Sequence, residues 1–326
     1  MRSRIVAITL SVLLFFSALY IVGFPEKEIT VNNTTSVSSE AETEATTEKE
    51  VETVICSFKD ISYGSDQKQT IDLDLPVDNR KETGLVLFLH GGGWVSGDKT
   101  STGNAYRINM PNKHFATATI NYRLAELGKA DIYDIINDIT AALSHIKEFA
   151  AGYGININKL VLCGYSAGGH LALLYAYKYK HLSPIELVGV FANSPAVDLS
   201  LDKFYEENSM GDEDFMCELM SNACGVEFTK TTREEHADLL KELSPINYIS
   251  ADSVPTVIAH GRLDTVVPIE ASELFIKTLS ENSVSSDLII FEKSSHNLNN
   301  DLETKAYADE VISKYVTKWL ELDKNN

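Results

Sequence analysis

Positive charge is scarce in this chain of 326 residues, in which 28 lysines and arginines face 47 aspartates and glutamates. The formal net charge of -19 at pH 7 argues against nucleic-acid binding, because the phosphate backbone would be repelled. The same charge disfavours adhesion of a folded domain to anionic lipid. Hydrophobic residues make up 44% of the chain, which is enough for one large domain with its own core.

Cysteine is also sparse, and the four cysteines lack the paired C-x-x-C spacing of a metal site. The histidines show no H-x-x-x-H or H-E-x-x-H motif, so we expect neither a metal nor another cofactor. Cys163 is expected to be a buried thiol. Cys217 and Cys224 lie seven residues apart, and the sequence leaves open whether they form a disulfide in an exported chain.

No charged residue interrupts the apolar run over 5–24, which directly follows Arg2 and Arg4. Positive residues before such a run are typical of an export signal, and about 20 residues are enough for a helix to span a bilayer. No A-x-A cleavage motif or lipoprotein-type cysteine follows the run. We therefore expect 1–25 to be either a cleaved signal peptide or a membrane-inserted signal-anchor. In both cases the catalytic part is exported, either extracellular or anchored and facing outward.

Aromatic residues are absent from 26–53, a segment rich in threonine, serine and glutamate. It has no apolar periodicity, so it cannot bury enough surface to offset the entropy cost of ordering it. We expect a disordered spacer between a membrane or wall and the folded part. The folded domain is then predicted to cover 54–326.

The most informative motif is G-x-S-x-G at 164–168, with Ser166 at its centre. A predicted strand precedes the motif and a predicted helix follows it, which is the context that gives this motif meaning. Such a sharp turn strains its central residue and exposes the hydroxyl, while Gly164 and Gly168 fit because a Cβ would clash there. Backbone N–H groups at the start of the helix favour developing negative charge. Ser166 is therefore the candidate nucleophile.

Three consecutive glycines follow another predicted strand, in the motif H-G-G-G-W at 90–94. Glycines at the end of a strand leave backbone N–H groups free to approach a ligand, and the oxyanion of a tetrahedral intermediate needs such donors. We predict an oxyanion hole formed by the N–H groups of Gly92, Gly93 and Ala167. The alternative is a plain flexible loop, which has no need for the flanking histidine and tryptophan. The other residues of this motif are His90, Gly91 and Trp94.

Two further residues complete a candidate catalytic triad. Asp264 lies in the loop after an apolar run at 256–259, and His296 lies in the loop after the last run, at 288–291. A hydroxyl needs a neutral imidazole to take its proton, and the imidazole needs a carboxylate to fix its tautomer. Taken alone, each would be interpreted as an ordinary loop residue. Both, however, follow the last two predicted strands of the chain. The order Ser166, Asp264, His296 is that of α/β-hydrolases, not that of chymotrypsin or subtilisin.

From about residue 54 onward, these motifs resemble the α/β-hydrolase superfamily, in its carboxylesterase branch with an H-G-G-G oxyanion motif. That branch includes hormone-sensitive-lipase-like esterases and arylformamidase-like hydrolases. N-Y-R-L at 121–124 resembles a D-Y-R-L segment of the family, with Asn121 where aspartate is commoner. The resemblance implies structural rather than catalytic roles for Tyr122, Arg123 and Asp138.

Eight runs are predicted as strands. The first two alternate, as half-exposed antiparallel strands do, and the rest are apolar runs typical of parallel strands covered on both faces. Helical patterns between them predict an α/β-hydrolase fold, with a mostly parallel eight-stranded sheet and helices on both faces. The candidate triad and the glycine run all follow strands, where active sites of such sheets lie. The predicted strands are 56–63, 70–75, 85–89, 115–120, 160–163, 187–192, 256–259 and 288–291, and the predicted helices are 132–149, 168–179, 269–281 and 304–322.

Residues 198–243 break this alternation, because they contain no strand pattern. Helices are compatible with 214–223 and 233–243. The resemblance implies that such an insertion forms a small cap over the site, whereas the alternative is a long excursion without a role in substrate binding. Some apolar side chains there are candidates for lining a pocket, although packing of the helices explains them equally well; they are Phe204, Tyr205, Phe215 and Met216.

Serine carboxylester hydrolysis through an acyl-enzyme intermediate is the leading functional hypothesis. An arylformamidase-like or peptidase-like C–N hydrolase would use the same triad, and a non-catalytic exported binding protein is the alternative from another class. No strongly apolar lid is present, and a polar cover is a poor lining for a long acyl chain. We therefore expect small-molecule or polysaccharide-linked esters with short acyl groups, about acetyl to butyryl. The acidic residues of the insertion are Asp202, Glu206, Glu207, Asp212, Glu213 and Asp214.

Overall fold

The structure is a computed structural model that describes residues 54–77, 81–101, 115–206 and 210–321. The signal peptide or signal-anchor expected at 1–25 and the spacer expected at 26–53 lie outside the described residues. Within the described part, no helix is both long and apolar enough to cross a bilayer.

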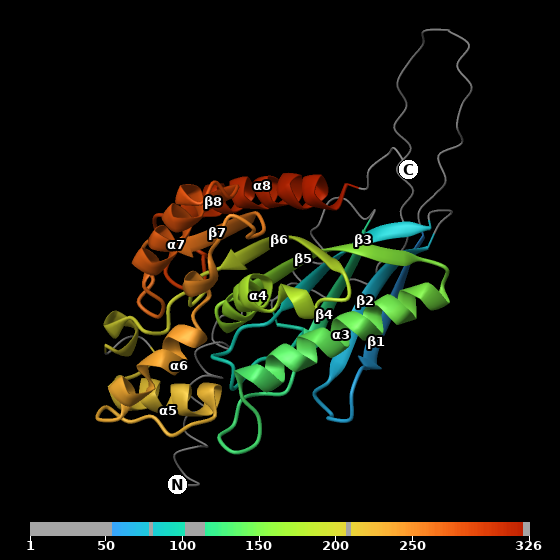
Figure 1. The fold of residues 1–326 in the computed structure, drawn as a ribbon. Coiled ribbons are helices and arrows are strands. Elements are labelled where there is room, and N and C mark those ends of the chain that lie inside the picture. Colours follow the sequence, from blue (N-terminus) through green and yellow to red (C-terminus); the bar gives the residue numbers. More distant parts are fainter. Residues whose placement is uncertain (1–53, 78–80, 102–114, 207–209, 322–326) are drawn as a thin grey trace, which may run out of the picture.

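One eight-stranded sheet forms the centre of the molecule (Figure 1). Its strands are β1 (Val54–Ser62), β2 (Thr70–Val77), β3 (Glu82–Leu89), β4 (Ala116–Asn121), β5 (Asn156–Tyr165), β6 (Glu186–Asn193), β7 (Thr256–Gly261) and β8 (Ser286–Phe291). Their order across the sheet is β1-β2-β4-β3-β5-β6-β7-β8. β2 runs antiparallel to β1 and to β4, whereas the remaining neighbours are parallel. The predicted mostly parallel sheet is confirmed.

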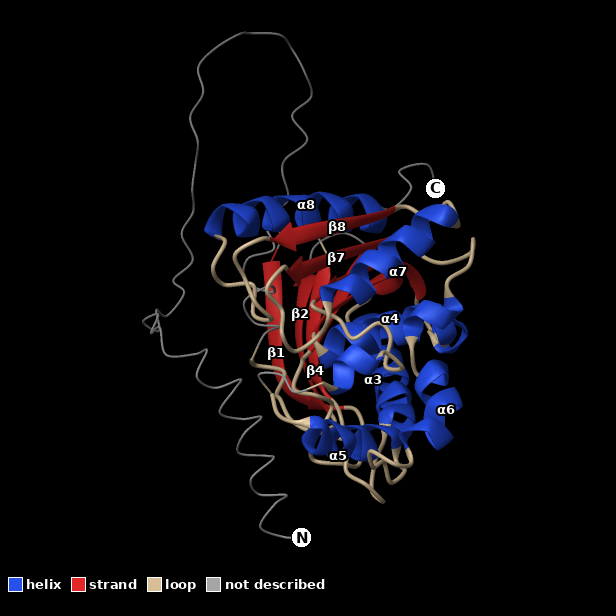
Figure 2. Cartoon of the chain, turned by 90° about the vertical axis from the view of Figure 1, so that its left-hand side faces the viewer, coloured by secondary structure: helices blue, strands red, loops and turns tan. Residues whose placement is uncertain are grey.

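Helices cover both faces of this sheet, as predicted (Figures 1 and 2). The longer ones are α3 (Ile132–Gly152), α4 (Ala167–Lys178), α5 (Glu213–Cys224), α6 (Ala237–Glu242), α7 (Ile269–Glu281) and α8 (Leu302–Leu320), and the single-turn ones are η1 (Lys180–Leu182), η2 (Asp202–Tyr205), η3 (Arg233–His236) and η4 (Pro245–Tyr248). Buried residues of α3, α4 and α7 belong to one core cluster, and those of α8 belong to a second. The two clusters lie on opposite faces of the sheet.

The central strand β3 shows why these segments are apolar throughout. Leu85, Leu87 and Leu89 belong to the core on the α3 and α4 side, whereas Val86 and Phe88 belong to the core beneath α8. Successive side chains of a strand point to opposite faces, so a strand covered on both sides needs apolar residues at every position. β5 is longer than its apolar run predicted, because its polar first residues still pair with β3 through the backbone.

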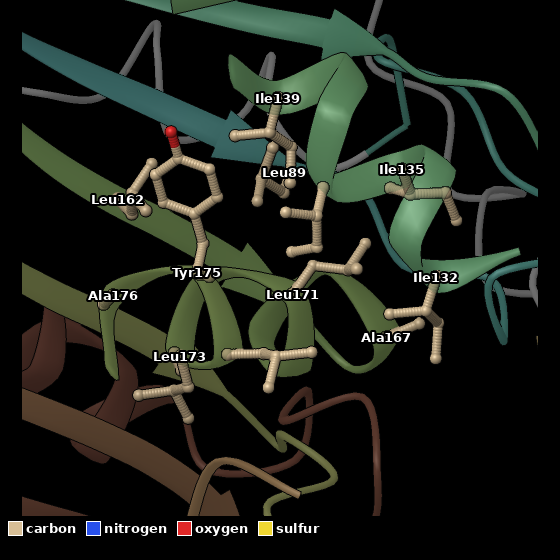
Figure 3. Packing of buried hydrophobic residues seen from close by; sticks show 14 of the residues in the cluster. Leu89, Ile132, Ile135, Ile139, Leu162, Ala167, Leu171, Leu173, Tyr175 and Ala176 are labelled. Atoms are coloured by element: carbon tan, nitrogen blue, oxygen red, sulfur yellow. The ribbon is translucent and has the colours of Figure 1, made fainter. Parts of the chain in front are cut away.

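Packing between α3 and α4 fixes the start of α4. Figure 3 shows Ile135 and Ile139 of α3 close to Leu171 and Tyr175 of α4, with Leu89 of the sheet between the two helices. All five side chains are buried. Since each fully buried side chain of this size contributes about 1.5–3 kcal/mol, this contact holds the N-terminus of α4 firmly against the sheet.

The insertion at 198–243 contains α5 and α6 and no strand among its described residues. Asp212 accepts a hydrogen bond from Phe215 N and so caps α5, and Gly225 ends the helix at a φ of 70°. Figure 2 shows α5 and α6 together at one end of the molecule, with α8 at the other. The helices expected in this segment are therefore present.

Cys217 and Cys224 are free thiols, as are Cys56 and Cys163. Both lie on α5, where seven residues correspond to about 10.5 Å along the helix axis. A disulfide needs Cα atoms within about 7 Å, so the helix keeps the two thiols apart. The disulfide that the sequence left open does not form.

Candidate active site

Ser166 stands at the corner between β5 and α4, where its backbone has φ 53° and ψ -120°. Its N–H donates to Asn193 O at 2.8 Å, and its carbonyl accepts from His170 N at 2.9 Å. These bonds hold the residue from both sides in a backbone conformation that residues other than glycine rarely adopt. The hydroxyl makes no capping bond to the helix and is left for another partner.

The two glycines of the G-x-S-x-G motif are required by close backbone contacts. A Cβ on Gly164 would lie 2.2 Å from Gly168 O, and one on Gly168 would lie 2.2 Å from Leu89 O. Neither backbone can move away without opening the corner between strand and helix. The steric reason that we predicted for both glycines is thus visible in the structure.

His296 and Asp264 meet Ser166 at hydrogen-bonding distance. His296 Nε2 lies 2.9 Å from Ser166 Oγ, and His296 Nδ1 lies 2.7 Å from Asp264 Oδ2. A carboxylate can only accept, so Nδ1 carries the proton and the lone pair of Nε2 faces the serine hydroxyl. The structure therefore brings together three residues that are as much as 130 positions apart in the chain.

Asp264 is a fully buried carboxylate with donors on both oxygens. Oδ1 accepts from the N–H groups of Val266 at 2.8 Å and Val267 at 2.9 Å. Burial alone would raise the pKa of Asp264, but His296 and His260 outweigh it and hold the pKa well below its usual range. Asp264 is consequently ionised at neutral pH, and its negative charge faces His296.

Two hydroxyl groups anchor the loop that carries His296. Tyr165 Oη donates to His296 O at 3.2 Å, and Ser194 Oγ donates to the same oxygen at 3.1 Å. The Tyr165 ring also lies against the imidazole, with 5.2 Å between ring centres. Sequence reasoning missed both residues. Tyr165 occupies a variable position of the motif, and Ser194 follows β6 without any pattern of its own.

The glycine run lies against Ser166. A Cβ on Gly91 would lie 3.3 Å from Ser166 Cβ, while Gly92 and Gly93 have φ values of 118° and 58°. Ser96 donates to Gly92 O from both N, at 3.0 Å, and Oγ, at 2.8 Å. In a planar trans peptide the N–H of Gly93 points opposite to that bound carbonyl. It is therefore directed away from the Ser96 turn.

Three backbone N–H groups at this corner have no acceptor among the described residues. They belong to Gly92, Gly93 and Ala167. Ala167 is the first residue of α4, where helix geometry leaves the N–H without an intrahelical partner. Such groups need another acceptor, which a negatively charged oxygen at the serine would supply.

The other two residues of the glycine motif are buried structural supports. Burial lowers the pKa of His90 to about 4, and its ring stacks on Tyr122 with 4.1 Å between ring centres. Trp94 Nε1 donates to His170 Nδ1 at 3.1 Å, and His170 Nε2 donates to Leu243 O at 2.8 Å. This chain of bonds joins the glycine run to α4 and to the end of the insertion.

Helix α5 lies against the glycine run. A Cβ built on Gly93 would be 3.1 Å from Leu219 Cδ1 of that helix. The insertion therefore touches the site, as a cap does. Phe204, Tyr205 and Met216 are buried in the main core cluster and Phe215 packs against it, which matches the alternative that these side chains pack the helices.

The residues that the resemblance marked as structural connect the end of β4 with α3, with the start of β2 and with the loop after the glycine run. Asp138 accepts hydrogen bonds from Gln69 Nε2 at 2.8 Å and from Arg123 Nη2 at 2.7 Å. Asn121 accepts from Lys99 N through Oδ1 and donates to Asp98 Oδ2 through Nδ2, at 2.6 and 2.9 Å. An aspartate at 121 would place a second carboxylate beside Asp98, so the amide suits this chain.

No group of three or more histidine, cysteine, aspartate or glutamate side chains that could hold a metal occurs in the part of the chain that the structure describes. The site geometry consists of a hydroxyl, an imidazole, a carboxylate and backbone N–H groups. These groups can transfer a proton and can stabilise a negative charge on an oxygen atom that is bound beside Ser166.

A family comparison agrees with this geometry. The BD-FAE family model matches residues 71–279, which is more than half of the chain and spans the glycine run, Ser166 and Asp264. The chain belongs to the BD-FAE family. His296 lies beyond the matched segment and was found by its position after β8.

Several relatives of this BD-FAE family member are esterases by name. Esterase LipC of Mycobacterium tuberculosis is 23% identical over 239 residues, which cover 67% of this chain and 54% of LipC. The chain spans about half the length of the curated relatives it matches.

Solved structures share the fold of this BD-FAE family member at low identity. Esterase 2 of Thermogutta terrifontis, phosphonylated by sarin, has a TM-score of 0.64 at 20% identity and covers 82% of this chain and 97% of its own. A truncated carbohydrate esterase from gut microbiota has a TM-score of 0.64 at 18% identity, covering 81% of this chain and 96% of its own. The predicted α/β-hydrolase fold is confirmed.

Proposed function

We propose that this protein is a serine carboxylesterase that works through an acyl-enzyme intermediate. One observation carries the proposal: Asp264, His296 and Ser166 form a continuous hydrogen-bonded series of 2.7 and 2.9 Å. The serine at its end occupies a strained corner, beside backbone N–H groups without an acceptor in the described chain. The esterase names of the relatives support the same reaction.

In the first half of the reaction, Ser166 Oγ attacks the ester carbonyl while His296 Nε2 takes the hydroxyl proton. Asp264 holds the imidazole in the required tautomer and stabilises the cation that forms. The N–H groups of Gly92, Gly93 and Ala167 bind the oxyanion, each donor being worth about 10²–10³ in kcat in comparable sites. His296 then gives the proton to the departing alcohol.

In the second half, water attacks the acyl-enzyme. His296 Nε2 takes a proton from the water, and the second tetrahedral intermediate uses the same three N–H groups. When that intermediate collapses, His296 returns the proton to Ser166 Oγ and the carboxylic acid leaves. The imidazole thus serves as base and then as acid in each half.

A fluorophosphonate probe tests the assignment of the nucleophile. The wild-type protein should be labelled and should hydrolyse p-nitrophenyl acetate, whereas Ser166→Ala should lose labelling and at least about a thousandfold in kcat. Ser295→Ala is a matched control, because this nearby serine is not part of the series. Labelling that persists in a folded Ser166→Ala variant would refute the assignment, and an unlabelled, inactive wild type would favour a binding protein.

For the substrate, we propose water-soluble esters with short acyl groups, on small molecules or on polysaccharides. Leu219 of α5 lies next to Gly93, so α5 limits the space beside the proposed oxyanion donors. The insertion is acidic along the start of α5, at Asp212, Glu213 and Asp214. A structural neighbour named as a carbohydrate esterase supports the polysaccharide alternative.

A series of p-nitrophenyl esters tests the acyl preference. Each methylene that fits adds up to about 0.8 kcal/mol of binding, so kcat/KM should rise from acetyl and fall beyond about butyryl where the pocket ends. Acetylated xylan and a formanilide extend the series to polysaccharide esters and C–N bonds. Preference for emulsified long-chain triglyceride over p-nitrophenyl acetate would overturn the proposal.

We further propose that the enzyme is exported. The support is the uncharged apolar run over 5–24 behind Arg2 and Arg4. Cell fractionation of a tagged full-length chain separates a released product from one held by its N-terminal segment, and activity confined to the cytosol would contradict export.

A further inference from the structure

A second histidine contacts the carboxylate that serves His296. His260 is the fifth residue of β7, and its side chain is fully buried. Its Nε2 lies 3.1 Å from Asp264 Oδ2 and 3.1 Å from Val267 O, while its Nδ1 lies 2.9 Å from Ser272 Oγ. Neither the motifs nor the proposed reaction assigns this ring a role.

The neighbours of the ring define where its proton lies. Both atoms close to Nε2 are acceptors, so Nε2 carries the proton and shares it between Asp264 and Val267. Nδ1 then accepts from the hydroxyl of Ser272, which is a buried residue of α7. In its neutral form, His260 therefore has a hydrogen-bond partner for both ring nitrogens. Ser272 of α7 holds the ring in place.

With His260 included, every approach to the Asp264 carboxylate is occupied. Oδ1 receives two backbone N–H groups, and Oδ2 receives one imidazole N–H from each histidine. A carboxylate that pivots about its Cβ–Cγ bond would break bonds on both oxygens at once. Four donors thus fix the orientation of the carboxylate. Apart from His296 itself, only His260 donates to Oδ2.

We propose that His260 is a positioning residue, which aims Asp264 Oδ2 at His296 and moderates the negative charge that His296 experiences. The inference rests on the proposed esterase function. His260 touches neither substrate nor Ser166 and acts only through Asp264. Besides Asp264 and His296, Glu270 in the first turn of α7 acts electrostatically on His260, and it is paired with Lys203 at 2.5 Å.

The test compares His260→Leu with His260→Gln. Leucine removes the N–H donor, and glutamine keeps an N–H on a side chain of similar reach. His260→Leu should lower kcat about tenfold to a hundredfold with KM nearly unchanged, since a hydrogen bond to a charged group is lost. His260→Gln should recover most of that loss.

The pH profile separates positioning from mere packing. Without the His260 donor, the full charge of Asp264 acts on His296, so the imidazole is protonated at higher pH. The acid limb of kcat/KM should therefore move to higher pH in His260→Leu and return in His260→Gln. The low-field NMR signal of the His296 Nδ1 proton should shift in the same variant, because its acceptor changes.

Two measurements keep the test decisive. Fluorophosphonate labelling of the wild type reports on the esterase function itself, so an inactive and unlabelled wild type rejects that function rather than the role of His260. Ser272→Ala loosens the ring from its far side and should give a smaller change in the same direction, even if His260→Leu does not fold. Unchanged kcat, or a lower kcat with an unmoved acid limb, in a folded variant would overturn the inference.

Discussion

Strained residues occur at Ser166 and on the segments beside it. Trp94, Ser166 and Ser194 have φ values of 64°, 53° and 44°, in the region that side chains rarely adopt. Each such residue costs about 1–3 kcal/mol and persists only where its surroundings hold it. Here backbone hydrogen bonds hold these residues, such as those from Ser166 N to Asn193 O and from Ala125 N to Trp94 O. The strain directs the serine hydroxyl toward His296.

Gly168→Ala should distort this corner. The new Cβ would lie 2.2 Å from Leu89 O and 2.5 Å from His90 O, and both are backbone atoms that cannot rotate away. We expect a loss of about 3 kcal/mol or more in the free energy of unfolding, together with a large loss of esterase activity. Urea unfolding and p-nitrophenyl acetate hydrolysis measure the two effects.

Gly152→Ala provides the matched control for that substitution. A Cβ at this position meets nothing within 4 Å, and the residue ends α3. Its stability should stay equal or rise by up to about 1 kcal/mol, because alanine reduces the entropy of the unfolded chain. Equal stability of both variants would show that the contact at Gly168 is not restrictive.

At the scale of elements, one buried imidazole connects three segments of the site. His170 belongs to the first turn of α4, accepts from Trp94 in the glycine run and donates to Leu243 where the insertion returns. The glycine run, α4 and the insertion therefore share one support. A displacement of any one segment would therefore strain the bonds that this ring makes to the other two.

Trp94→Phe should weaken this connection. Phenylalanine lacks the indole N–H, so His170 Nδ1 becomes a buried acceptor without a donor at a cost of about 1–3 kcal/mol. We expect lower stability and a lower kcat, because the glycine run loses one attachment. A double-mutant cycle with His170→Leu measures the coupling by urea unfolding. Strict additivity of the two substitutions would contradict the connection.

For the whole molecule, stability should depend on pH through two buried histidines. Burial lowers the pKa of both His90 and His170 to about 4, although nearby carbonyl groups oppose the shift. The unfolded chain binds protons at the ordinary pKa of about 6.5, so it binds more protons than the folded chain between pH 6.5 and 4. The free energy of unfolding is therefore highest above that window and falls as the pH is lowered through it. The fall amounts to up to about 3 kcal/mol for each histidine.

Urea unfolding between pH 7.5 and 4.5 measures this dependence. His170→Gln should flatten the curve, since glutamine does not titrate, even if its stability at pH 7 is lower. His181→Gln is the control, because this exposed histidine should leave the slope unchanged. A wild-type stability that is constant across the window would contradict the predicted cost of protonating the buried rings.

The amino-acid sequence by itself determined the elements and most of the reacting groups. Apolar runs and helical periodicity located the strands and helices, and the order Ser166, Asp264, His296 indicated the fold before any contact was known. These signals are local, because a strand, a helix or a glycine-bounded turn depends on a few consecutive residues. The steric demand at Gly164 is local in the same sense, because a Cβ there would meet Gly168, whereas the demand at Gly168 comes from Leu89 and His90 at the end of another strand.

Only the tertiary structure decided which distant groups meet. His260 shares Asp264 with His296, Tyr165 and Ser194 hold the His296 loop, and Leu219 lies next to Gly93. Each of these contacts depends on the order of strands in the sheet and on the path of the loops, which no short window encodes. The free thiols on α5 follow from helix geometry, which the spacing of the two cysteines alone did not reveal.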